Sequence, residues 1–537
     1  MENNLVTTRQ RYKMFIADSG IVKDTSSNLT DFLDLVDDFE QEAGNLYEAT
    51  PHEEILSAIL ANAQKINFLQ YAFPDCEKLV QERALLESQS SEENSQKIRS
   101  IDEKLSKMKL KTKHYLVITI EQTINLIKSN KWGICLNNGQ VYLYNDAYWK
   151  LIDKEGLQKL FGEIAEKLSV PTFDARHYHF REELLKQFYA VAHLPRPKRG
   201  RENLLMNFKN GTLEIFPDKQ ILRKPSAEDF LTYQLPFEYN PNASAIKWQI
   251  FLDRVLPDKS LQDVLGEYFA SAFISNRTLK LEKVLMTVGS GSNGKGVVYE
   301  VITELFGREN VSNFSLESLT DNQGYYRAKI ADKLLNYSSE NSSKVDANYF
   351  KQLASGEDVP ARNPYGEPFQ ISDYAKLIFN TNKLPKEGVE QTHAFFRRFL
   401  IIPFDVTISE EEADKELHLK IIARELPGVF NWVMKGLRRL LSQKGYTACE
   451  AVTRKLEEYK IQSDSVRLFL QDEGWVKAPE SEAIFMKDLY TKYNLYCNQS
   501  GLRAVSIREF SIRLKEAGYE TRRVGLGVKA YLTQSAA

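Results

Sequence analysis

The feature that most constrains the fold of this chain is the run GSGSNGK, which occupies positions 289–295. It follows the apolar segment VLMTV (284–288) and precedes VVYEVITELFG (297–307), whose spacing indicates an amphipathic helix. This is the pattern G-x-x-x-x-G-K between a strand and a helix, where backbone N–H groups and a helix N-terminus can surround phosphate. The sequence therefore predicts a phosphate-binding loop. The alternative is a glycine-rich turn before a buried helix.

Within this loop, Lys295 is expected to reach the β- and γ-phosphate oxygens of a nucleotide. One position departs from the usual pattern, because Gly296 follows the lysine and the hydroxyl that ordinarily binds Mg²⁺ is missing. Either another group or water fills that position, or nucleotide binding is weaker. The residues expected around the nucleotide are Gly289, Ser290, Gly291, Ser292, Asn293, Gly294, Lys295, Gly296 and Val297.

Around the loop, residues 280–405 alternate between strand-like and helical segments. Besides VLMTV, strands are expected in KLLNYSSE (333–340), KLIFNTN (376–382) and RFLIIPF (398–404). Such alternation predicts a three-layer α/β domain, with expected bounds 276–410.

Polar residues stand at the ends of these strands. A nucleotide hydrolase needs an acid that orders Mg²⁺ and polarises the attacking water, and Glu340 follows the second apolar segment. Asn382 could hydrogen-bond γ-phosphate and water, or it could cap a turn before Pro385. Arg397 and Arg398 precede the last strand. A guanidinium there could stabilise transition-state charge on a neighbouring subunit's γ-phosphate, which requires an oligomer.

Between the acid and the asparagine, residues 350–371 indicate a helix end followed by a two-stranded hairpin. Lys351, Arg362 and Tyr365 would offer charge for phosphate and a ring for a base, which is what single-stranded DNA requires. An ordinary polar hairpin is the alternative.

Residues 1–115 are expected to be helical and to serve assembly or partner binding. DFLDLVDDFEQE (31–42) has apolar residues at helical spacing. Further along, apolar residues three and four apart indicate a short coiled coil or helical hairpin with a turn at 88–96, although a solvated surface helix explains them equally well. Those residues are Ile98, Ile101, Leu105 and Met108.

Residues 116–275 are expected to form an accessory domain. Strands are predicted at YLVITI (115–120), QVYLYN (140–145) and NLLMNFKNGTLEIF (203–216), the last folded about an Asn210-Gly211 turn. Helices are predicted at 156–168 and 180–192, and the basic segment HLPRPKRGR (193–201) is predicted to be a loop.

After a helical lid or connector at 411–462, residues 463–537 are predicted to form a small basic module of helices followed by strands. From 501 to the end there are seven bases and three acids. A DNA-binding module would have this character, and an exposed basic helix is the alternative. The candidate DNA contacts are Arg508, Arg513, Lys515, Arg522 and Arg523.

Composition limits the class of protein. The chain has 537 residues, which at about 150 per domain predicts three or four domains. A formal charge of −2 excludes a uniformly basic nucleic-acid coat. The four cysteines are not spaced as zinc ligands, and neither a signal peptide nor a membrane-spanning run is found. We therefore expect an intracellular protein that does not contact a membrane.

The order of the motifs resembles that of superfamily 3 helicases of the phage and plasmid primase-helicase family, the group that also holds the poxvirus primase-helicase. The matching sequence segments, in order, are GSGSNGKGV, LLNYSSE, FKQLASGEDVPARNPYGEPF, AKLIFNTNKLP and FFRRFLIIPF. Segments at 203–215 and 230–252 resemble the family's accessory domain, and 486–525 is similar to its C-terminal winged helix. The resemblance covers about 120–535.

This resemblance implies an AAA+-like P-loop core in a hexameric ring, which hydrolyses ATP with Mg²⁺ at subunit interfaces and threads DNA through its centre. It matches Lys295 to the phosphate-binding lysine, Glu340 to the acid, Asn382 to the polar sensor, and either Arg397 or Arg398 to the trans-acting finger. The hairpin residues fall in the DNA-gripping segment. Ser339 stands where some relatives carry a second acid.

The implied role is a helicase that unwinds DNA during replication of a phage, plasmid or integrated mobile element, in the cytoplasm of a bacterial host or infected cell. Expected partners are single-stranded and forked DNA, further copies of the chain, and a primase, polymerase or initiator bound by the N-terminal region. No primase activity is expected, because the acids of 31–42 have helical spacing. The alternatives are a nucleotide-dependent DNA-binding initiator or assembly platform with little turnover, and an NTPase unrelated to nucleic acid.

Overall fold

The structure is a computed structural model that describes residues 39–41, 49–89, 92–130, 132–137, 139–192, 204–216, 219–276, 278–339, 344–363, 367–386 and 388–534. These residues form two compact units, one within Asp37–Tyr239 and a larger one from Asn240 onward. The boundary after Tyr239 falls inside the region 116–275 that the sequence assigns to one accessory domain.

The smaller unit packs its helices around a core in which Phe161, Ile164, Leu184 and Phe188 are at most 1% exposed. Its helices are α2 (His52–Asn62), α3 (Phe68–Ala72), α4 (Cys76–Glu87), α5 (Glu92–Lys107), α6 (Thr112–Ser129), α7 (Lys154–Lys167), α8 (Thr172–Arg176) and α9 (Tyr178–Val191). Helices α7 and α9 confirm the two predicted helices of this region. An antiparallel sheet has the order β2 (Gly133–Asn137), β3 (Gln140–Tyr144) and β4 (Trp149–Ile152), and β3 confirms the strand predicted there.

The strand predicted for YLVITI (115–120) is wrong, because these residues lie within the 18-residue helix α6. β-Branched residues favour a strand locally. However, Ile120, Thr123 and Ile127 recur at helical spacing and are buried together. The Thr123 hydroxyl donates to the Thr119 carbonyl at 2.8 Å, so the buried polar group is satisfied inside the helix. Burial of one helical face therefore outweighs the local preference.

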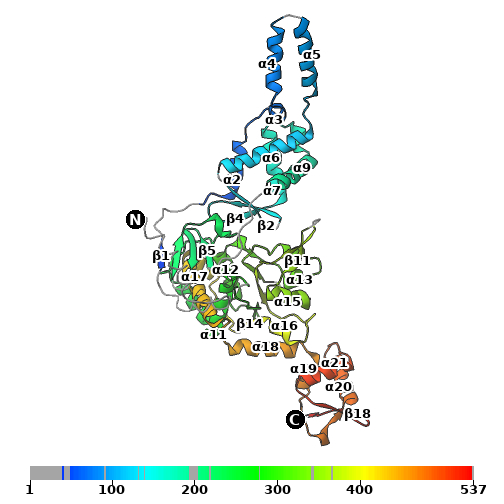
Figure 1. Ribbon diagram of the computed structural model, residues 1–537. Helices are drawn as coiled ribbons and strands as arrows, with labels where there is room; N and C mark the ends of the chain where they lie inside the picture. The colour runs from blue at the N-terminus through cyan, green and yellow to red at the C-terminus, as the bar shows by residue number, and fades with distance from the viewer. Residues whose placement is uncertain are drawn as a thin grey trace, which may run out of the picture. The chain divides into compact units, whose positions relative to one another are not determined.

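Helices α4 and α5 lie side by side as a hairpin (Figure 1), which confirms the predicted helical hairpin. The turn is shorter than the predicted 88–96, because α5 begins at Glu92. Among the described residues of its arms, the buried side chains are Cys76 and Ile101. An ion pair joins the arms, with 2.6 Å between Arg83 Nε and Asp102 Oδ1. Most of the hairpin's surface is therefore open to solvent.

The segment NLLMNFKNGTLEIF forms β5 (Leu204–Phe208) and β6 (Gly211–Ile215), which confirms the predicted hairpin. The turn lies one residue earlier than predicted, at Lys209-Asn210, because Phe208 pairs with Gly211. The sheet continues with β7 (Gln220–Arg223) and then β1 (Phe39–Gln41), which pairs with β7 in parallel. The helix predicted over 31–42 is therefore wrong for Phe39–Gln41, because their backbone pairs with the free edge of β7. The rest of that segment, like the basic loop 193–201, lies outside the described residues.

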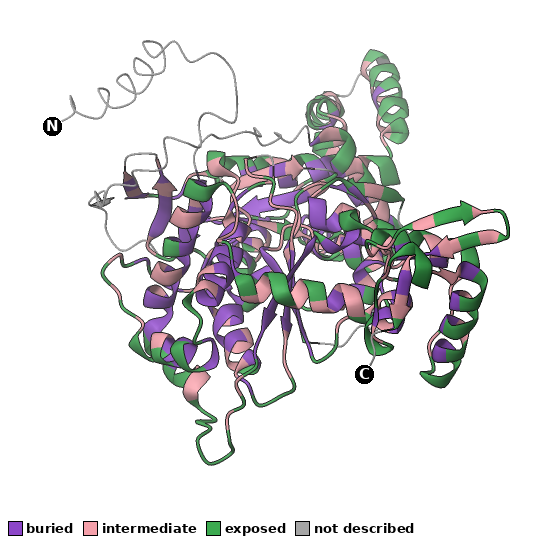
Figure 2. Cartoon of the chain, turned by 90° about the horizontal axis from the view of Figure 1, so that it is seen from below, coloured by how far each residue is buried: buried purple, intermediate pink, exposed green. Residues whose placement is uncertain are grey.

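A five-stranded parallel sheet is the centre of the larger unit. Its strands are β8 (Val284–Val288), β9 (Val311–Ser312), β10 (Leu335–Ser338), β13 (Lys376–Thr381) and β14 (Phe399–Pro403). All four predicted strands are confirmed, and the order in the sheet is β14-β8-β13-β10-β9. The first strand of the sheet along the chain thus lies between the fourth and fifth. In Figure 2 the buried residues, in purple, gather in these strands and on the helices beside them.

Helices cover this sheet and continue beyond it. They are α10 (Ile246–Val255), α11 (Lys259–Ala270), α12 (Lys295–Phe306), α13 (Leu316–Leu319), α14 (Tyr325–Ala328), α15 (Ala347–Ser355), α16 (His393–Phe396), α17 (Leu417–Gln443) and α18 (Glu450–Gln462). The last two confirm the helical stretch predicted after the sheet. Helix α17 packs against α10, α11 and α12.

Helix α17 also completes the start of α10. Ala245, the residue before α10, offers no side-chain cap. Instead, the Glu425 carboxylate of α17 accepts hydrogen bonds from Lys247 N at 3.2 Å and Trp248 N at 3.1 Å. A negative charge at a helix N-terminus is favourable, so Glu425 fastens the two helices together.

The segment 350–371 forms the predicted helix end and hairpin. Strand β11 (Val359–Arg362) pairs with β12 (Pro368–Ile371) in antiparallel register after α15 ends. The residues between these strands include 364–366, which lie outside the described residues.

The C-terminal residues form a small module with its own core, which contains Phe469, Tyr493 and Phe510. Its helices are α19 (Ser465–Asp472), α20 (Met486–Gln499) and α21 (Ile507–Glu516). Strand β15 (Trp475–Lys477) pairs with β19 (Leu532–Gln534), and β16 (Ile484–Phe485), β18 (Gly527–Ala530) and β17 (Thr521–Val524) form a second sheet in that order. The module ends in strands, as predicted, but β15 and β16 lie between α19 and α20, so the helices do not all precede the strands. None of the described helices has both the length and the apolar composition needed to cross a membrane.

Candidate nucleotide-binding site

The loop 289–294 connects β8 to α12, as predicted, and turns sharply at three residues with positive φ. These are Gly291 at 116°, Ser292 at 48° and Gly294 at 85°. Glycine reaches such values without a steric penalty, whereas Ser292 carries a Cβ and must be held there. The Ser292 carbonyl accepts a hydrogen bond from Ile408 N at 2.7 Å, so the chain beyond β14 fixes the loop in this conformation.

Close contacts require glycine at both ends of the loop. A Cβ on Gly289 would lie 1.9 Å from Asn293 Nδ2 and 2.6 Å from the Phe404 carbonyl oxygen. A Cβ on Gly294 would lie 2.8 Å from Val255 and 2.9 Å from Phe251, both on α10. The loop is therefore pressed between the end of β14 and helix α10.

Lys295 begins α12 with its side chain turned into the loop, and the residue is 8% exposed. Its Nζ donates to the Gly289 carbonyl at 2.8 Å and to Asn293 Oδ1 at 3.0 Å. Asn293 in turn donates to the Phe404 carbonyl at 3.0 Å. Burial lowers the pKa of Lys295. The ammonium group is thus held where an anionic oxygen inside the loop could accept its hydrogen bonds in place of the Gly289 carbonyl and Asn293 Oδ1.

The space around Gly296 is open, because a Cβ there would meet no heavy atom within 4 Å. Gly296 lies in the first turn of α12, directly after the lysine. The missing hydroxyl is therefore not a consequence of crowding.

Asn382 stands beside the start of the loop, as predicted. Thr381, the last residue of β13, is opposite Val288, so β13 and β8 end at the same edge of the sheet. Gly289 N donates to the Thr381 carbonyl at 3.3 Å, and exposed Asn382 follows immediately.

Just below this edge, a buried polar pair was missed by the sequence analysis. The Thr287 hydroxyl of β8 donates to Asn380 Oδ1 of β13, and both residues are at most 6% exposed. An asparagine inside the apolar run KLIFNT was the available signal, because a buried amide needs a partner. The pair joins the two central strands directly beneath the loop.

The predicted acid, Glu340, lies outside the described residues. Strand β10 ends at Ser338 beside β13, and Ser339 is exposed. The assignment of Glu340 as the acid stays a prediction.

The two adjacent arginines have different surroundings. Arg398 is 8% exposed, and its guanidinium donates to Ser355 Oγ at 2.9 and 3.1 Å, to the Lys351 carbonyl at 3.2 Å and to the Ala394 carbonyl. The Arg397 side chain is 45% exposed and pairs with Glu282, with 2.7 Å between Nη2 and Oε2. Arg398 therefore holds α15 and α16 together, whereas Arg397 is accessible.

Arg397 lies at the opposite edge of the sheet from the loop. Strands β14 and β8 are parallel, with Phe399 opposite Val284 and Pro403 opposite Val288. Five strand residues span about 16 Å at roughly 3.3 Å per residue, which is longer than an arginine side chain. Arg397 therefore cannot reach a nucleotide bound at the loop of its own chain.

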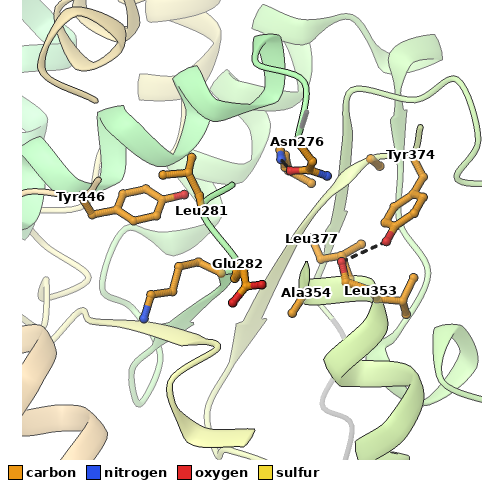
Figure 3. A pocket seen from close by; sticks show the side chains of 11 residues that line it. Asn276, Leu281, Glu282, Leu353, Ala354, Tyr374, Leu377 and Tyr446 are labelled. Carbon is orange, nitrogen blue, oxygen red and sulfur yellow. Dashed lines mark hydrogen bonds between the residues drawn. The ribbon is translucent and has the colours of Figure 1, made fainter. Parts of the chain in front are cut away.

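Glu282 beside Arg397 lines a small pocket at this amino edge (Figure 3), together with Lys283 and Lys376. Partial burial opposes ionisation of Glu282, but Lys280 and Arg397 outweigh it and lower its pKa. Burial lowers the pKa of Lys376 to about 8, and its Nζ donates to Asn276 Oδ1. Glu282 was not predicted from the sequence, because no pattern links it to an arginine 115 positions later.

The candidate DNA contacts of the hairpin region are not all presented alike. Lys351 is on α15 and is paired with Glu390 at 2.6 Å. Arg362 ends β11 and is exposed, and Tyr365 lies outside the described residues.

In the C-terminal module, four of the five candidate bases are exposed. Arg508 and Lys515 lie seven residues apart on α21, and Arg522 and Arg523 lie on β17. Arg513 is turned inward, where it contacts Glu509 at 2.8 Å and buried Asp464 at 3.3 Å. It therefore links α21 to the start of α19.

Comparison with known proteins finds two matching families. Residues 121–257 match the family described as D5 N terminal like, and residues 287–398 match a family of unknown function, DUF5906. A relative is "Putative helicase 184R" of Invertebrate iridescent virus 6, which is 24% identical over 358 residues. That alignment covers 56% of this chain and 35% of the relative, so the chain spans about a third of that protein's length.

Among solved structures, the apo C-terminal region of NrS-1 aligns with a TM-score of 0.45 and 13% identity, over 76% of this chain and 97% of that one. An A-form apo structure of the same region gives 0.40 and 12%, over 76% and 98%. The D5 N terminal like match and the viral helicase support the resemblance to phage and viral primase-helicases.

Proposed function

We propose that this chain is an ATP-dependent DNA helicase that assembles into a ring, hydrolyses ATP between its subunits and unwinds DNA during replication of a phage, plasmid or related element. The observation that carries the proposal is the division of the site between two edges of one sheet. The loop with Lys295 is at the carboxyl edge, and accessible Arg397 is at the amino edge.

Each half is incomplete in a single chain. Lys295 and the loop N–H groups would hold the phosphates, and Asn382 beside the loop would orient the attacking water. The positive charge needed at the γ-phosphate would come from Arg397 of an adjacent copy, because its own loop is out of reach. Head-to-tail repetition of that contact closes into a ring, for which we propose a hexamer.

The strand order supports an AAA+-like core, since the loop follows the inner strand β8, Asn382 follows its neighbour β13, and Glu340 comes two residues after the end of β10, on the other side of β13. Mg²⁺ bound with ATP would neutralise phosphate charge. Among the described residues no three His, Cys, Asp or Glu side chains gather as metal ligands. Glu340 and water are therefore the proposed partners of the ion, and the open space at Gly296 leaves room for that water.

DNA would be held at two places. The β11–β12 hairpin, with Arg362 and Tyr365, would contact a single strand. The C-terminal module has the helix and strand order of a winged helix, so exposed α21 and β17 would contact a duplex backbone. A nucleotide-dependent initiator or assembly platform is the second candidate, and the missing hydroxyl at Gly296 favours it.

The test is steady-state ATP hydrolysis by the full chain with and without single-stranded DNA, followed by strand separation on a forked duplex. We expect DNA to accelerate hydrolysis and Lys295→Ala to remove it. Lys259→Ala, at an exposed lysine of α11, is the matched control and should leave the rate unchanged. ATP binding without turnover, even with DNA, would favour the assembly platform. No binding of ATP would contradict both candidates.

A further inference from the structure

The hairpin of β17 and β18 ends in an exposed leucine. Val524 pairs with Gly527, so Gly525 and Leu526 form the two-residue connection at the tip. Leu526 is 91% exposed. Its neighbours at the tip are glycines, so no adjacent side chain shields it. The connection does not require a large apolar residue, because polar residues are the usual occupants of such turns.

The rest of the hairpin is basic. Residues 521–534 contain three bases and no acid. Arg522 and Lys529 are directly opposite each other on the two strands. Like charges in this arrangement destabilise an isolated hairpin, so the pairing favours a polyanion as the partner. Arg522 and Arg523 are exposed beside the tip.

The hairpin is also firmly attached to its module. Strand β18 pairs with β16, where Phe485 is opposite Lys529, and Lys529 Nζ lies 5.4 Å from the centre of the Phe485 ring. Ala530, at the base of the hairpin, is fully buried. A rigid hairpin can transmit force to a single side chain at its tip, whereas a mobile loop cannot.

We propose that Leu526 is an apolar wedge that enters duplex DNA between two base pairs while the bases of the hairpin hold the flanking phosphates. This inference rests on the proposed DNA-binding function and deepens it. Minor-groove proteins that hold DNA with Arg and Lys unstack base steps in this way, by inserting apolar side chains between them. The narrow tip, with glycine on both sides of Leu526, leaves the leucine as the first large group to meet the duplex.

The experiment uses the full chain and a duplex with 2-aminopurine placed at successive positions, since its fluorescence rises when the base is unstacked. We expect the wild type to raise the fluorescence at one step. Leu526→Ser should remove that rise and weaken duplex binding about tenfold. Leu526→Met, which keeps a large apolar side chain, should retain both. Leu495→Ser is the matched control, because Leu495 is another exposed leucine of the same module, 58% exposed and on α20 instead of the hairpin.

Equal fluorescence and equal affinity for the wild type and Leu526→Ser would overturn the wedge. So would a change of oligomeric state in Leu526→Ser with an unchanged DNA signal, which would make the tip a contact between copies. DNA-stimulated ATP hydrolysis is measured on the same samples. If that stimulation persists while no base unstacks, the inference fails and the helicase proposal stands. If the wild type does not bind DNA at all, both fail.

Discussion

Substituting the two adjacent arginines separately tests how the site is divided between subunits. Arg397→Ala removes a half-exposed ion pair with Glu282, which is worth about 0–1 kcal/mol in the free energy of unfolding. Arg398→Ala removes a buried guanidinium from Ser355 Oγ and two backbone carbonyls, which costs about 2–4 kcal/mol. At about 2 °C per kcal/mol, the Tm should fall by about 4–8 °C for Arg398→Ala and by at most about 2 °C for Arg397→Ala.

Activity should follow the opposite order. Arg397→Ala should lower kcat for ATP hydrolysis by about 10³ or more, because a positive charge is lost from the γ-phosphate. Arg398→Ala should stay within a few-fold of the wild type at temperatures where it is folded. The assays are thermal unfolding and steady-state ATP hydrolysis on the same preparations.

Mixing two inactive variants distinguishes action between subunits from action within one. Arg397→Ala has an intact loop and Lys295→Ala has an intact Arg397. In an equal random mixture, about a quarter of the sites should combine an intact loop with an intact arginine from the next copy and should be active. No recovery after the copies have exchanged would refute the trans assignment. A wild-type kcat for Arg397→Ala, or a dead but fully stable Arg398→Ala, would refute the division of roles.

Further outcomes are expected from the surroundings of single residues. Gly296→Ser should lower the Mg²⁺ concentration needed for half-maximal ATP hydrolysis several-fold, because there is room for the added hydroxyl. Gly289→Ala should abolish nucleotide binding, because the added Cβ would clash with the Phe404 carbonyl oxygen. Lys376 has a pKa of about 8 in the folded chain, below its unfolded value, so the unfolded state binds more protons above pH 8. The stability measured by urea unfolding should therefore gain a contribution between about pH 8 and 10.5 that Lys376→Met lacks. Arg508→Ala should weaken duplex binding and reduce its salt dependence by about one unit of slope, while Arg513→Ala should lower the Tm instead.

Three results would contradict these expectations. An unchanged Mg²⁺ requirement in Gly296→Ser would mean that the open space does not face the ion. If the stability of Lys376→Met depended on pH in the same way as that of the wild type, the titrating group would not be Lys376. If Arg513→Ala kept the wild-type Tm and lost affinity for DNA, Arg513 would contact DNA and would not stabilise the module.

The sequence was most informative where local pattern and tertiary role agree. The apolar run 284–288, the glycines and the lysine of the loop are adjacent in the chain, so their arrangement follows from local conformation. The strand predicted for YLVITI was wrong because β-branched residues favour a strand locally, whereas the packing of α6 depends on residues up to Ile127. Similarly, Phe39–Gln41 pairs with β7 about 180 residues away, which no local spacing reveals.

The roles of the two arginines show the same limit within the site. Arg397 and Arg398 are chemically identical in the sequence, and only the direction of each side chain at the start of β14 separates the buried one from the accessible one. Glu282 and the contact of Gly294 with α10 likewise depend on folding. Patterns in the sequence identified the loop, but its supports come from distant segments.

The cap that Glu425 places on α10 has a consequence for how the chain is made. Helix α10 presses on Gly294, yet its first N–H groups are satisfied by a residue 178 positions later. During synthesis the ribosome releases the loop and α10 long before α17 emerges, so the nucleotide site would be assembled late. A chain that stops after β14 would hold every residue of the loop and lack the helix that keeps its support in place.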